Sequence, residues 1–337
     1  MTDRQVPSAW LNVPSTSGLL AVGNSHSIYW RSFGHHDAMP VIALHGGPGS
    51  GSDPHHLTFF DPQIHRVIMF DQRGTGQSTP SVTTINNTSQ DLLNDIEKLR
   101  RYLSVERWLV FGVSWGASLA LLYSQNHPQV ITGLVLAGLS NRHDHQTAWI
   151  LEERARLLPE RHEEFLKALA PGDRADPIAA YYRKSLSPDR KNKLEATYAV
   201  WVLEADLEGP EPQTLPTMSL NEIDESMVNR AMIYLHYWAN KTFLPHGHLL
   251  INPSALIELP VVLVHGASDW ICPLSGAQQV ADSIEGSQLI VVPGAGHSPY
   301  SADMVQALRE SIVATTQRNA RLTTTNSSMR CPVEVKH

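Results

Sequence analysis

The segment that most constrains the fold of this chain is a Gly-x-Ser-x-Gly motif at residues 112–116. The aromatic and bulky apolar residues 108–111 before it are typical of a buried strand, whereas Leu119 and Tyr123 after it recur at helical spacing. A strand that passes into a helix through such a motif makes a sharp turn, which holds the serine side chain clear of the sheet. The sequence therefore predicts a nucleophile elbow with Ser114 at its tip.

Glycine suits both ends of this motif, because a Cβ atom on a neighbouring residue would crowd so tight a turn. Gly112 and Gly116 occupy these two positions. The turn also directs the first N–H groups of the following helix toward the space beside Ser114, where an oxyanion would form. The backbone N–H of Trp115 is accordingly a predicted oxyanion donor.

A second glycine-rich segment, residues 45–49, follows a short predicted strand at residues 40–44. It lacks both the Lys-Ser/Thr ending of a P-loop and the spacing of a dinucleotide-binding fingerprint. In a hydrolase with a nucleophile elbow, the loop after this strand supplies the second oxyanion N–H, and glycine lets the backbone approach the substrate carbonyl. Gly47 is the predicted donor, with Trp115 as its partner.

Strands and helices alternate along the first part of the chain, which is the signature of a mostly parallel sheet flanked by helices. The strands predicted in this part are residues 25–33, 40–44, 66–70, 107–112 and 131–137, with a helix at 87–103.

Residues 139–252 contain helical runs such as 148–158 and 194–207, without a convincing strand. The sheet then resumes with strands at 260–265 and 288–292, followed by a closing helix at 302–315. A helical block inserted between strands of one sheet is most simply a cap over the site. The alternative is an independent helical domain.

These patterns predict an α/β-hydrolase fold with an inserted all-helical cap. The expected divisions are a first core part (1–138), the cap (139–252), a second core part (253–318) and a mobile tail (319–337).

Two polar residues follow the last two predicted strands at their carboxyl ends, where catalytic groups gather in open α/β sheets. Asp269 follows residues 260–265, and His297 follows residues 288–292. Ser114, Asp269 and His297 thus occur in the chain order Ser, acid, His that is typical of this fold. In the predicted mechanism His297 takes the Ser114 proton, Asp269 fixes the imidazole tautomer, and water releases the acyl-enzyme.

The predicted strand at residues 66–70 ends in a polar segment, residues 71–78. Its charged and amide side chains can link several loops through hydrogen bonds. We expect a structural role for Asp71 and Arg73 beneath the site.

Composition excludes several other classes of protein. The net charge of −7, without a basic stripe, argues against binding of nucleic acid or an anionic membrane. Cys272 and Cys331 are the only cysteines, so a disulfide framework is not expected. Residues 1–14 lack a signal-peptide pattern, and no apolar run approaches the ~18 residues of a membrane span. We expect a soluble, cytoplasmic protein.

Many of the seventeen histidines lie in polar loops, including the pairs His35-His36 and His55-His56. No HExxH or CxxC pattern accompanies them. The predicted chemistry needs no metal and no organic cofactor.

Taken together, the motifs resemble those of the proline iminopeptidase (prolyl aminopeptidase) family of serine peptidases. The matching segments are HGGPG at 45–49, DQRGTGQS at 71–78, GVSWG at 112–116 and GAGHS at 294–298, within a similarity that runs from about residue 18 to 308. The first two segments in combination are far more specific than Gly-x-Ser-x-Gly alone. The resemblance implies an α/β-hydrolase with a helical cap that releases an N-terminal residue, typically proline, from peptides.

Members of this family bind the free amine of the substrate through carboxylates of the cap, one of which ends a Trp-rich helix. Glu204 follows Trp201 and Leu203 and has Asp206 and Glu208 as acidic neighbours. The resemblance therefore implies that Glu204 binds the amine.

Two positions depart from the family pattern. Tyr234 stands where the pattern suggests a second glutamate, and Ala137 stands where an arginine often precedes the last glycine of a strand. Loss of one carboxylate weakens a charge-assisted contact to an amine, commonly by ~1–3 kcal/mol. Tyr234 can instead accept a hydrogen bond or admit a larger, less polar acyl group.

Three functions remain open on the sequence alone. The first is a serine aminopeptidase of the proline iminopeptidase type, acting on a small peptide. The second is an esterase, lactonase or amidase acting on a small molecule without a free amine, which Tyr234 and Ala137 would favour. The third is a non-catalytic ligand-binding protein on a hydrolase fold, against which the complete set of Ser, Asp and His counts.

Overall fold

A computed structural model gives the three-dimensional structure of the chain. It describes residues 6–140, 143–205, 207–209, 211, 218–244 and 249–328, with side chains described up to residue 318 except at 143–145.

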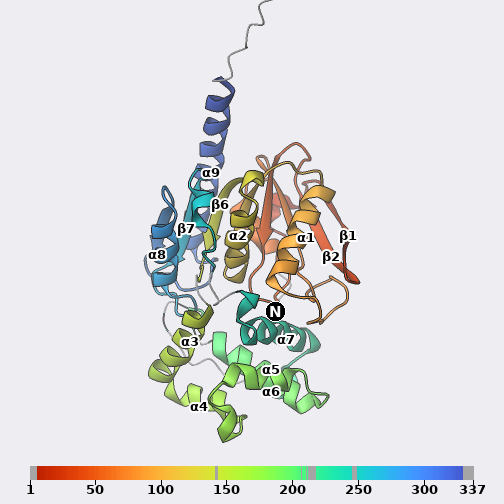
Figure 1. Ribbon diagram of the computed structural model, residues 1–337, viewed down its shortest axis with the longest axis vertical. Helices are drawn as coiled ribbons and strands as arrows, with labels where there is room; N and C mark the ends of the chain where they lie inside the picture. The colour runs from red at the N-terminus through yellow and green to blue at the C-terminus, as the bar shows by residue number, and fades with distance from the viewer. Residues whose placement is uncertain are drawn as a thin grey trace, which may run out of the picture.

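An eight-stranded sheet in the order β1-β2-β4-β3-β5-β6-β7-β8 forms the centre of the molecule (Figure 1). The strands are β1 (Ser15–Gly23), β2 (His26–Phe33), β3 (Met39–Leu44), β4 (His65–Phe70), β5 (Trp108–Val113), β6 (Ile131–Ala137), β7 (Val261–Gly266) and β8 (Gln288–Val292). β1 and β2 pair antiparallel with their neighbours, whereas every pair from β4 to β8 is parallel. Strands buried on both faces are expected in a parallel sheet covered by helices on both sides.

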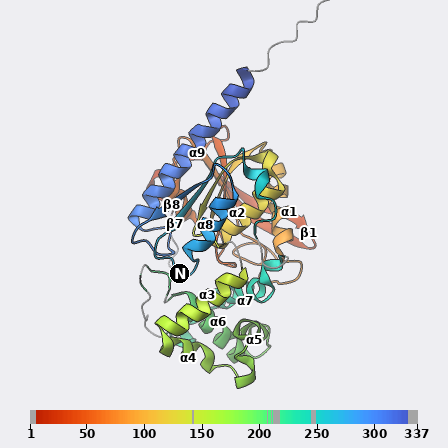
Figure 2. The ribbon, with the colours of Figure 1, turned by 60° about the vertical axis from the view of Figure 1, so that its left-hand side comes forward.

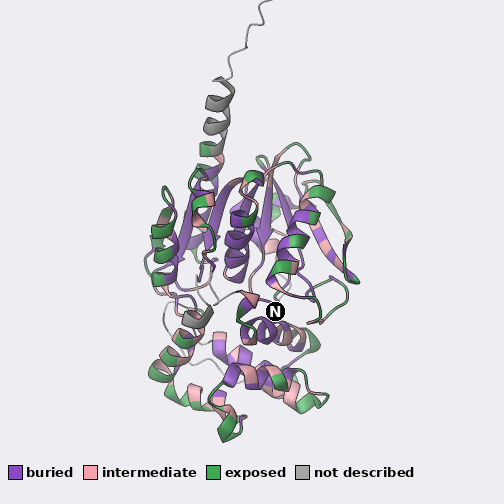
Figure 3. Ribbon diagram, viewed as in Figure 1, coloured by how far each residue is buried: buried purple, intermediate pink, exposed green. Residues whose placement is uncertain are grey.

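Alternate residues of the strands face two different helical layers, because successive side chains of a strand point to opposite faces. On one face, Ile42 and Leu44 join the apolar cluster of α1 (Ser89–Tyr102), α2 (Trp115–Asn126) and α8 (Leu274–Ser283). On the other face, Val41 and Ala43 join the cluster of the 3₁₀ turn η2 (Pro54–Phe59) and α9 (Ala302–Ser328). Figure 3 shows the resulting concentration of buried residues in the sheet and α2.

The chain between β6 and β7 forms a helical cap at one end of the sheet, opposite the end from which α9 projects (Figures 1 and 2). Its helices are α3 (His143–Leu157), α4 (Pro159–Lys167), α5 (Pro177–Ser185), α6 (Arg190–Ala205) and α7 (Glu225–Ala239). The cap has an apolar cluster of its own, which includes Tyr181, Leu203 and Trp238.

Helix α7 connects the cap to the core. Tyr237 donates a hydrogen bond to Asn87 Oδ1 at 2.7 Å, and its ring lies 5.1 Å from that of Trp115. Ile233 lies one turn earlier and packs closely on the backbone of Gly49. A Cβ atom added to Gly49 would lie 3.2 Å from the Cβ atom of Ile233. The cap is therefore held directly over the loops that follow β3 and β5.

The predicted α/β-hydrolase architecture with a helical insertion is confirmed, and two elements differ from expectation. Strand β1 was not predicted; it is an edge strand with mostly exposed residues. Helix α9 continues to Ser328, beyond the predicted end at residue 315. Within the described part of the chain, no helix combines the length and hydropathy that a membrane crossing requires.

Candidate active site

Ser114 lies at a sharp turn between β5 and α2, with backbone angles φ 56° and ψ −124°. Such a positive φ is uncommon for a residue with a side chain and marks stored strain. A Cβ atom on Gly112 would lie 2.2 Å from the carbonyl oxygen of Gly116, and one on Gly116 would lie 2.1 Å from that of Leu44. Only glycine fits at both positions, as the motif predicted.

The three residues proposed for nucleophilic chemistry meet at the carboxyl ends of β5, β7 and β8. The Oγ atom of Ser114 lies 3.0 Å from Nε2 of His297, and Nδ1 of His297 lies 2.8 Å from Oδ2 of Asp269. The second oxygen of Asp269 accepts the backbone N–H groups of Ile271 at 3.0 Å and Cys272 at 2.8 Å. The carboxylate is thereby fixed in orientation, and it holds the imidazole with Nε2 toward Ser114.

The charges of this pair support each other. Burial would lower the pKa of His297, but the charge and hydrogen bond of Asp269, together with the neighbouring Cys272, raise that pKa well above its ordinary value. Burial would raise the pKa of Asp269, but the charge and hydrogen bond of His297, together with His265 and the Cys272 backbone N–H, lower it below the ordinary value. Asp269 thus stabilises the imidazolium that forms when His297 takes a proton.

His265 is a further buried histidine beside this pair. Its Nε2 donates to the carbonyl of Cys272 at 2.8 Å and lies 3.5 Å from Oδ2 of Asp269. Burial lowers its pKa, which favours the neutral form. Within the described residues, no group of three or more His, Cys, Asp or Glu side chains could hold a metal ion.

The two predicted oxyanion donors, Gly47 and Trp115, line one cavity together with Ser114. The backbone of Gly46 approaches Ser114 so closely that a Cβ atom on it would lie 3.3 Å from the Ser114 Cβ. Gly47 has φ +111°, a conformation that favours glycine. Backbone N–H groups from these two loops are therefore available next to the nucleophile.

Gln72 links the same two loops. Its Oε1 accepts the indole N–H of Trp115 at 2.9 Å, and its Nε2 donates to the carbonyl of His45 at 2.9 Å. Its own backbone N–H donates to Nε2 of His45 at 3.1 Å. A single buried amide thus positions the start of α2 relative to the glycine-rich loop.

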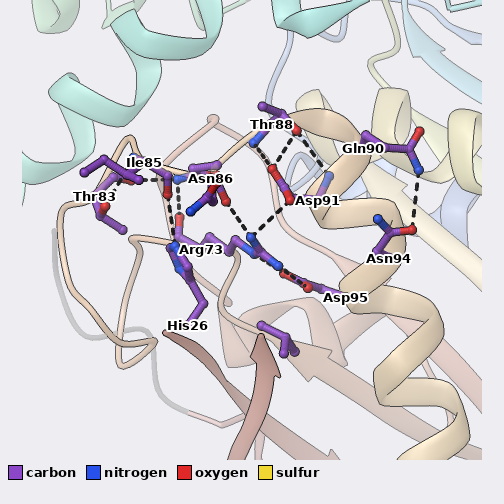
Figure 4. A network of polar contacts seen from close by, with 12 residues as sticks. His26, Arg73, Thr83, Ile85, Asn86, Thr88, Gln90, Asp91, Asn94 and Asp95 are labelled. Carbon is purple, nitrogen blue, oxygen red and sulfur yellow. Dashed lines mark hydrogen bonds and ion pairs between the residues drawn. The ribbon is translucent and has the colours of Figure 1, made fainter. Parts of the chain in front are cut away.

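Asp71 and Arg73 have the structural surroundings that the sequence predicted. Asp71 accepts the backbone N–H groups of Ser52 at 2.7 Å and Gln77 at 2.8 Å, which ties the loop after β3 to the loop after β4. Arg73 donates to both oxygens of Asp95 at 2.6 and 2.7 Å, within the polar network of Figure 4. Neither residue lines the cavity beside Ser114.

The cap closes this cavity on the side away from the sheet. Its contribution includes Gln146 of α3, Glu204 of α6, and Tyr234 and Trp238 of α7. Cys272, from the loop after β7, is buried in the wall, and its Sγ accepts a hydrogen bond from Gln146 Nε2 at 3.1 Å. A small cavity beside a nucleophile, lined by both polar and apolar side chains, is typical of a site for a small ligand.

Glu204 and Tyr234, the two predicted substrate-binding residues, both line this cavity. Glu204 is not alone: its Oε2 accepts a hydrogen bond from Nη2 of Arg230 at 2.8 Å. Glu208 is exposed. Its backbone carbonyl accepts a hydrogen bond from the backbone N–H of His297 at 3.1 Å. Asp206, the other acidic neighbour, lies outside the described residues.

Ala137 does not line the cavity; its side chain is fully buried in the core. Its carbonyl accepts the backbone N–H of Ser114 at 2.8 Å. The contribution of Arg230 was not predicted, whereas the role of Gln72 agrees with the loop-linking role expected for the amide side chains of residues 71–78. The sequence holds one indication of the role of Arg230: it lies four residues before Tyr234, which places both residues on one face of a helix.

The fold and the arrangement of Ser114, His297 and Asp269 define a serine hydrolase of the α/β-hydrolase class, and the model of the alpha/beta hydrolase fold family matches residues 39–302. A probable proline iminopeptidase from Leptolyngbya boryana is 38% identical over 302 residues, which cover 88% of this chain and 92% of that relative. A proline iminopeptidase from Arabidopsis thaliana is 38% identical over 300 residues, covering 87% and 79%. The chain belongs to the proline iminopeptidase family.

Solved structures agree on the fold. A proline iminopeptidase-related protein from Thermus thermophilus matches with a TM-score of 0.60 and 21% identity, covering 90% of this chain and 98% of the other. The proline iminopeptidase of Mycobacterium smegmatis matches with a TM-score of 0.54 and 20% identity, covering 89% and 99%. At these identities the likeness concerns the fold alone.

Proposed function

We propose that this protein is a prolyl aminopeptidase, which releases an N-terminal residue, typically proline, from small peptides. The observation that carries the proposal is the hydrogen-bonded series Ser114, His297 and Asp269, which opens into a cavity that the cap closes with Glu204. Membership of the proline iminopeptidase family supplies the substrate class.

The chemistry is acyl transfer through a covalent intermediate. His297 Nε2 takes the hydroxyl proton as Ser114 Oγ attacks the carbonyl carbon of the N-terminal residue. The N–H groups of Gly47 and Trp115 stabilise the oxyanion of the tetrahedral intermediate. His297 then gives its proton to the leaving amine, and a water molecule, activated by the same imidazole, hydrolyses the acyl-enzyme.

Asp269 acts through His297. Its carboxylate receives the Nδ1–H, which leaves Nε2 free to accept the serine proton. It also favours the charged imidazole, as the raised pKa of His297 indicates. The mechanism requires no metal and no organic cofactor.

A proline side chain and its amine would occupy the cap side of the cavity, where Glu204 offers a carboxylate and Tyr234 a hydroxyl. Either group can accept a hydrogen bond from the substrate nitrogen.

A second candidate is an esterase or amidase for a small molecule without a free amine. The ion pair between Glu204 and Arg230 favours it, since Glu204, the one carboxylate that lines the cavity within the described part of the chain, is already paired. The third candidate, a non-catalytic binding protein, predicts that a fluorophosphonate probe fails to label Ser114.

The deciding experiment is hydrolysis of L-proline β-naphthylamide beside p-nitrophenyl acetate, with Ser114→Ala as the control. Release of naphthylamine by the natural protein and not by the variant supports the aminopeptidase. Turnover of the ester with the proline amide untouched contradicts it and favours the second candidate. Absence of both activities together with absence of fluorophosphonate labelling favours the third.

We also infer that the enzyme works in the cytoplasm. The support is that Cys272 is a buried free thiol and that the composition offers no disulfide framework.

A further inference from the structure

Glu204, which lines the cavity, forms an ion pair between two helices of the cap with Arg230, which lies behind it and does not line the cavity. Arg230 of α7 donates from Nη2 to Oε2 of Glu204, at the end of α6, over 2.8 Å. The two side chains are 29% and 19% exposed, respectively. Partial burial strengthens such a pair relative to one in open solvent.

Tyr234 follows Arg230 by one helical turn and lines the same cavity. Its side chain is 1% exposed, and its hydroxyl has no hydrogen-bond partner among the described residues. Burial raises its pKa well above the ordinary value, and the negative charge of Glu204 adds to the effect. The hydroxyl therefore stays neutral, next to the Glu204 carboxylate, and can donate or accept a hydrogen bond in the cavity.

These three side chains determine the charge of the subsite. The negative charge of Glu204 is offset by that of Arg230, and Tyr234 contributes none. A substrate ammonium that approached Glu204 would share the carboxylate with a guanidinium, and the two cations would repel each other. An uncharged group of the same shape is not repelled by Arg230, so it can bind at such a subsite about as well as a charged one.

We propose that Arg230 is a specificity-determining residue, which neutralises Glu204 so that the acyl subsite accepts a proline-like group whether or not its nitrogen is charged. The substrate class is thereby extended from free N-terminal proline to uncharged five-membered-ring acyl groups. This inference rests on the proposed function, because it concerns the acyl group that Ser114 attacks.

The test compares two acyl groups of nearly equal shape, L-prolyl and cyclopentanecarbonyl, each as a β-naphthylamide and as a p-nitrophenyl ester. The quantity measured is the ratio of kcat/KM for prolyl to that for cyclopentanecarbonyl. In the natural protein this ratio is expected to lie within about tenfold of unity. Arg230→Gln frees Glu204 and is expected to raise the ratio by about tenfold or more, through a lower KM for the prolyl compounds.

Arg230→Lys keeps the positive charge and is expected to keep the ratio of the natural protein. Arg190→Gln is the matched control, because Arg190 pairs with Glu225 between the same two helices, where both side chains are exposed. It is expected to leave the ratio unchanged. A merely structural role of Arg230 would lower all four rates together and leave the ratio as it was.

A ratio above about a hundredfold in the natural protein, or one that Arg230→Gln does not change, overturns the inference. The two leaving groups keep this outcome separate from failure of the proposed function. If neither amide is cleaved but the ester ratio responds to Arg230→Gln, the aminopeptidase is contradicted and the role of Arg230 is supported. If the proline amide is cleaved and Arg230→Gln changes neither ratio, the aminopeptidase is supported and the role of Arg230 is contradicted.

Discussion

The indole nitrogen of Trp115, a residue that lines the candidate active site, donates to Oε1 of the buried Gln72 at 2.9 Å. The other end of the same amide donates to the carbonyl of His45. Trp115 and Gly47, the proposed oxyanion donors, thus belong to two loops that one buried side chain holds together. Small displacements of such groups have large effects on rate, because the oxyanion must lie close to both donors.

Gln72→Met, which keeps the volume but removes both hydrogen bonds, is expected to lower kcat by about tenfold to a hundredfold with little change in KM. The loss falls on kcat because the donors contact the transition state more strongly than the substrate. Steady-state kinetics on the preferred substrate measures it, alongside urea unfolding. A variant of reduced stability but unchanged kcat would show that Gln72 supports the fold and not the oxyanion hole.

Asp269→Asn is expected to lower kcat by about 10³- to 10⁴-fold, because an amide cannot hold the imidazole in the required tautomer. The pH profile supplies a second readout. Asp269 raises the pKa of His297, and activity requires the neutral imidazole, so activity falls as the pH drops through this pKa. Removal of the charge lowers the pKa, so the acid limb of the residual activity is expected at lower pH than in the natural protein. An acid limb at unchanged pH would contradict the pairing.

Gly116→Ala tests the tightness of the elbow. Its Cβ atom would lie 2.1 Å from the carbonyl oxygen of Leu44, so β3 and α2 must separate. We expect the free energy of unfolding to fall by about 3 kcal/mol or more, with loss of fluorophosphonate labelling. Gly172→Ala is the control, because nothing lies within 4 Å of its added Cβ; its effect should stay within about 0.5 kcal/mol. Equal urea midpoints for the two variants would contradict this account.

The parts of the fold that the sequence predicted are those in which local pattern and position agree. The strands β5, β7 and β8 carried continuous apolar runs, and Ser114, Asp269 and His297 each followed such a run at its carboxyl end. β5 and β7 are buried, whereas β8 is an edge strand in which only Val292 is buried. The parallel sheet then brings these ends to one edge. The site geometry therefore follows from motifs that are far apart in the chain but equivalent in the sheet.

Strand β1 was missed for a physical reason. As an edge strand it is mostly exposed, so its residues lack a clear apolar pattern. The signal that remained was the turn: Asn24 and Ser25, both with positive φ, close a two-residue hairpin between Gly23 and His26. Helix α9 likewise extends over polar residues that carry no helical apolar period.

The pairing of Glu204 with Arg230 could not be predicted from local sequence pattern. The two residues lie on different helices, and their contact depends on how α6 and α7 are packed against each other. Sequence spacing determines which residues share a face of one helix, but not which residues meet across two. The resemblance to a family supplied Glu204, whereas only the structure supplied its partner.

The buried pair of Arg73 and Asp95 gives the last prediction. Their side chains are 2% and 0% exposed, so Arg73→Gln leaves a carboxylate in the core without its partner. The free energy of unfolding is expected to fall by about 3–5 kcal/mol near pH 8. Arg190→Gln, which removes an exposed pair, should cost less than about 1 kcal/mol.

The pH dependence of this loss follows from the carboxyl group. Burial raises the pKa of Asp95 to about 6 even though Arg73 opposes it. Without Arg73 this pKa rises further above that of the unfolded chain, so the folded variant binds a proton more tightly than the folded natural protein does. The deficit of the variant is therefore largest at high pH and shrinks as the pH falls and Asp95 becomes protonated. Urea unfolding of both proteins at pH 8 and pH 5.5 measures it. A deficit that is equal at the two pH values, or larger at pH 5.5, would mean that the loss comes from packing around residue 73 and not from an unpaired charge on Asp95.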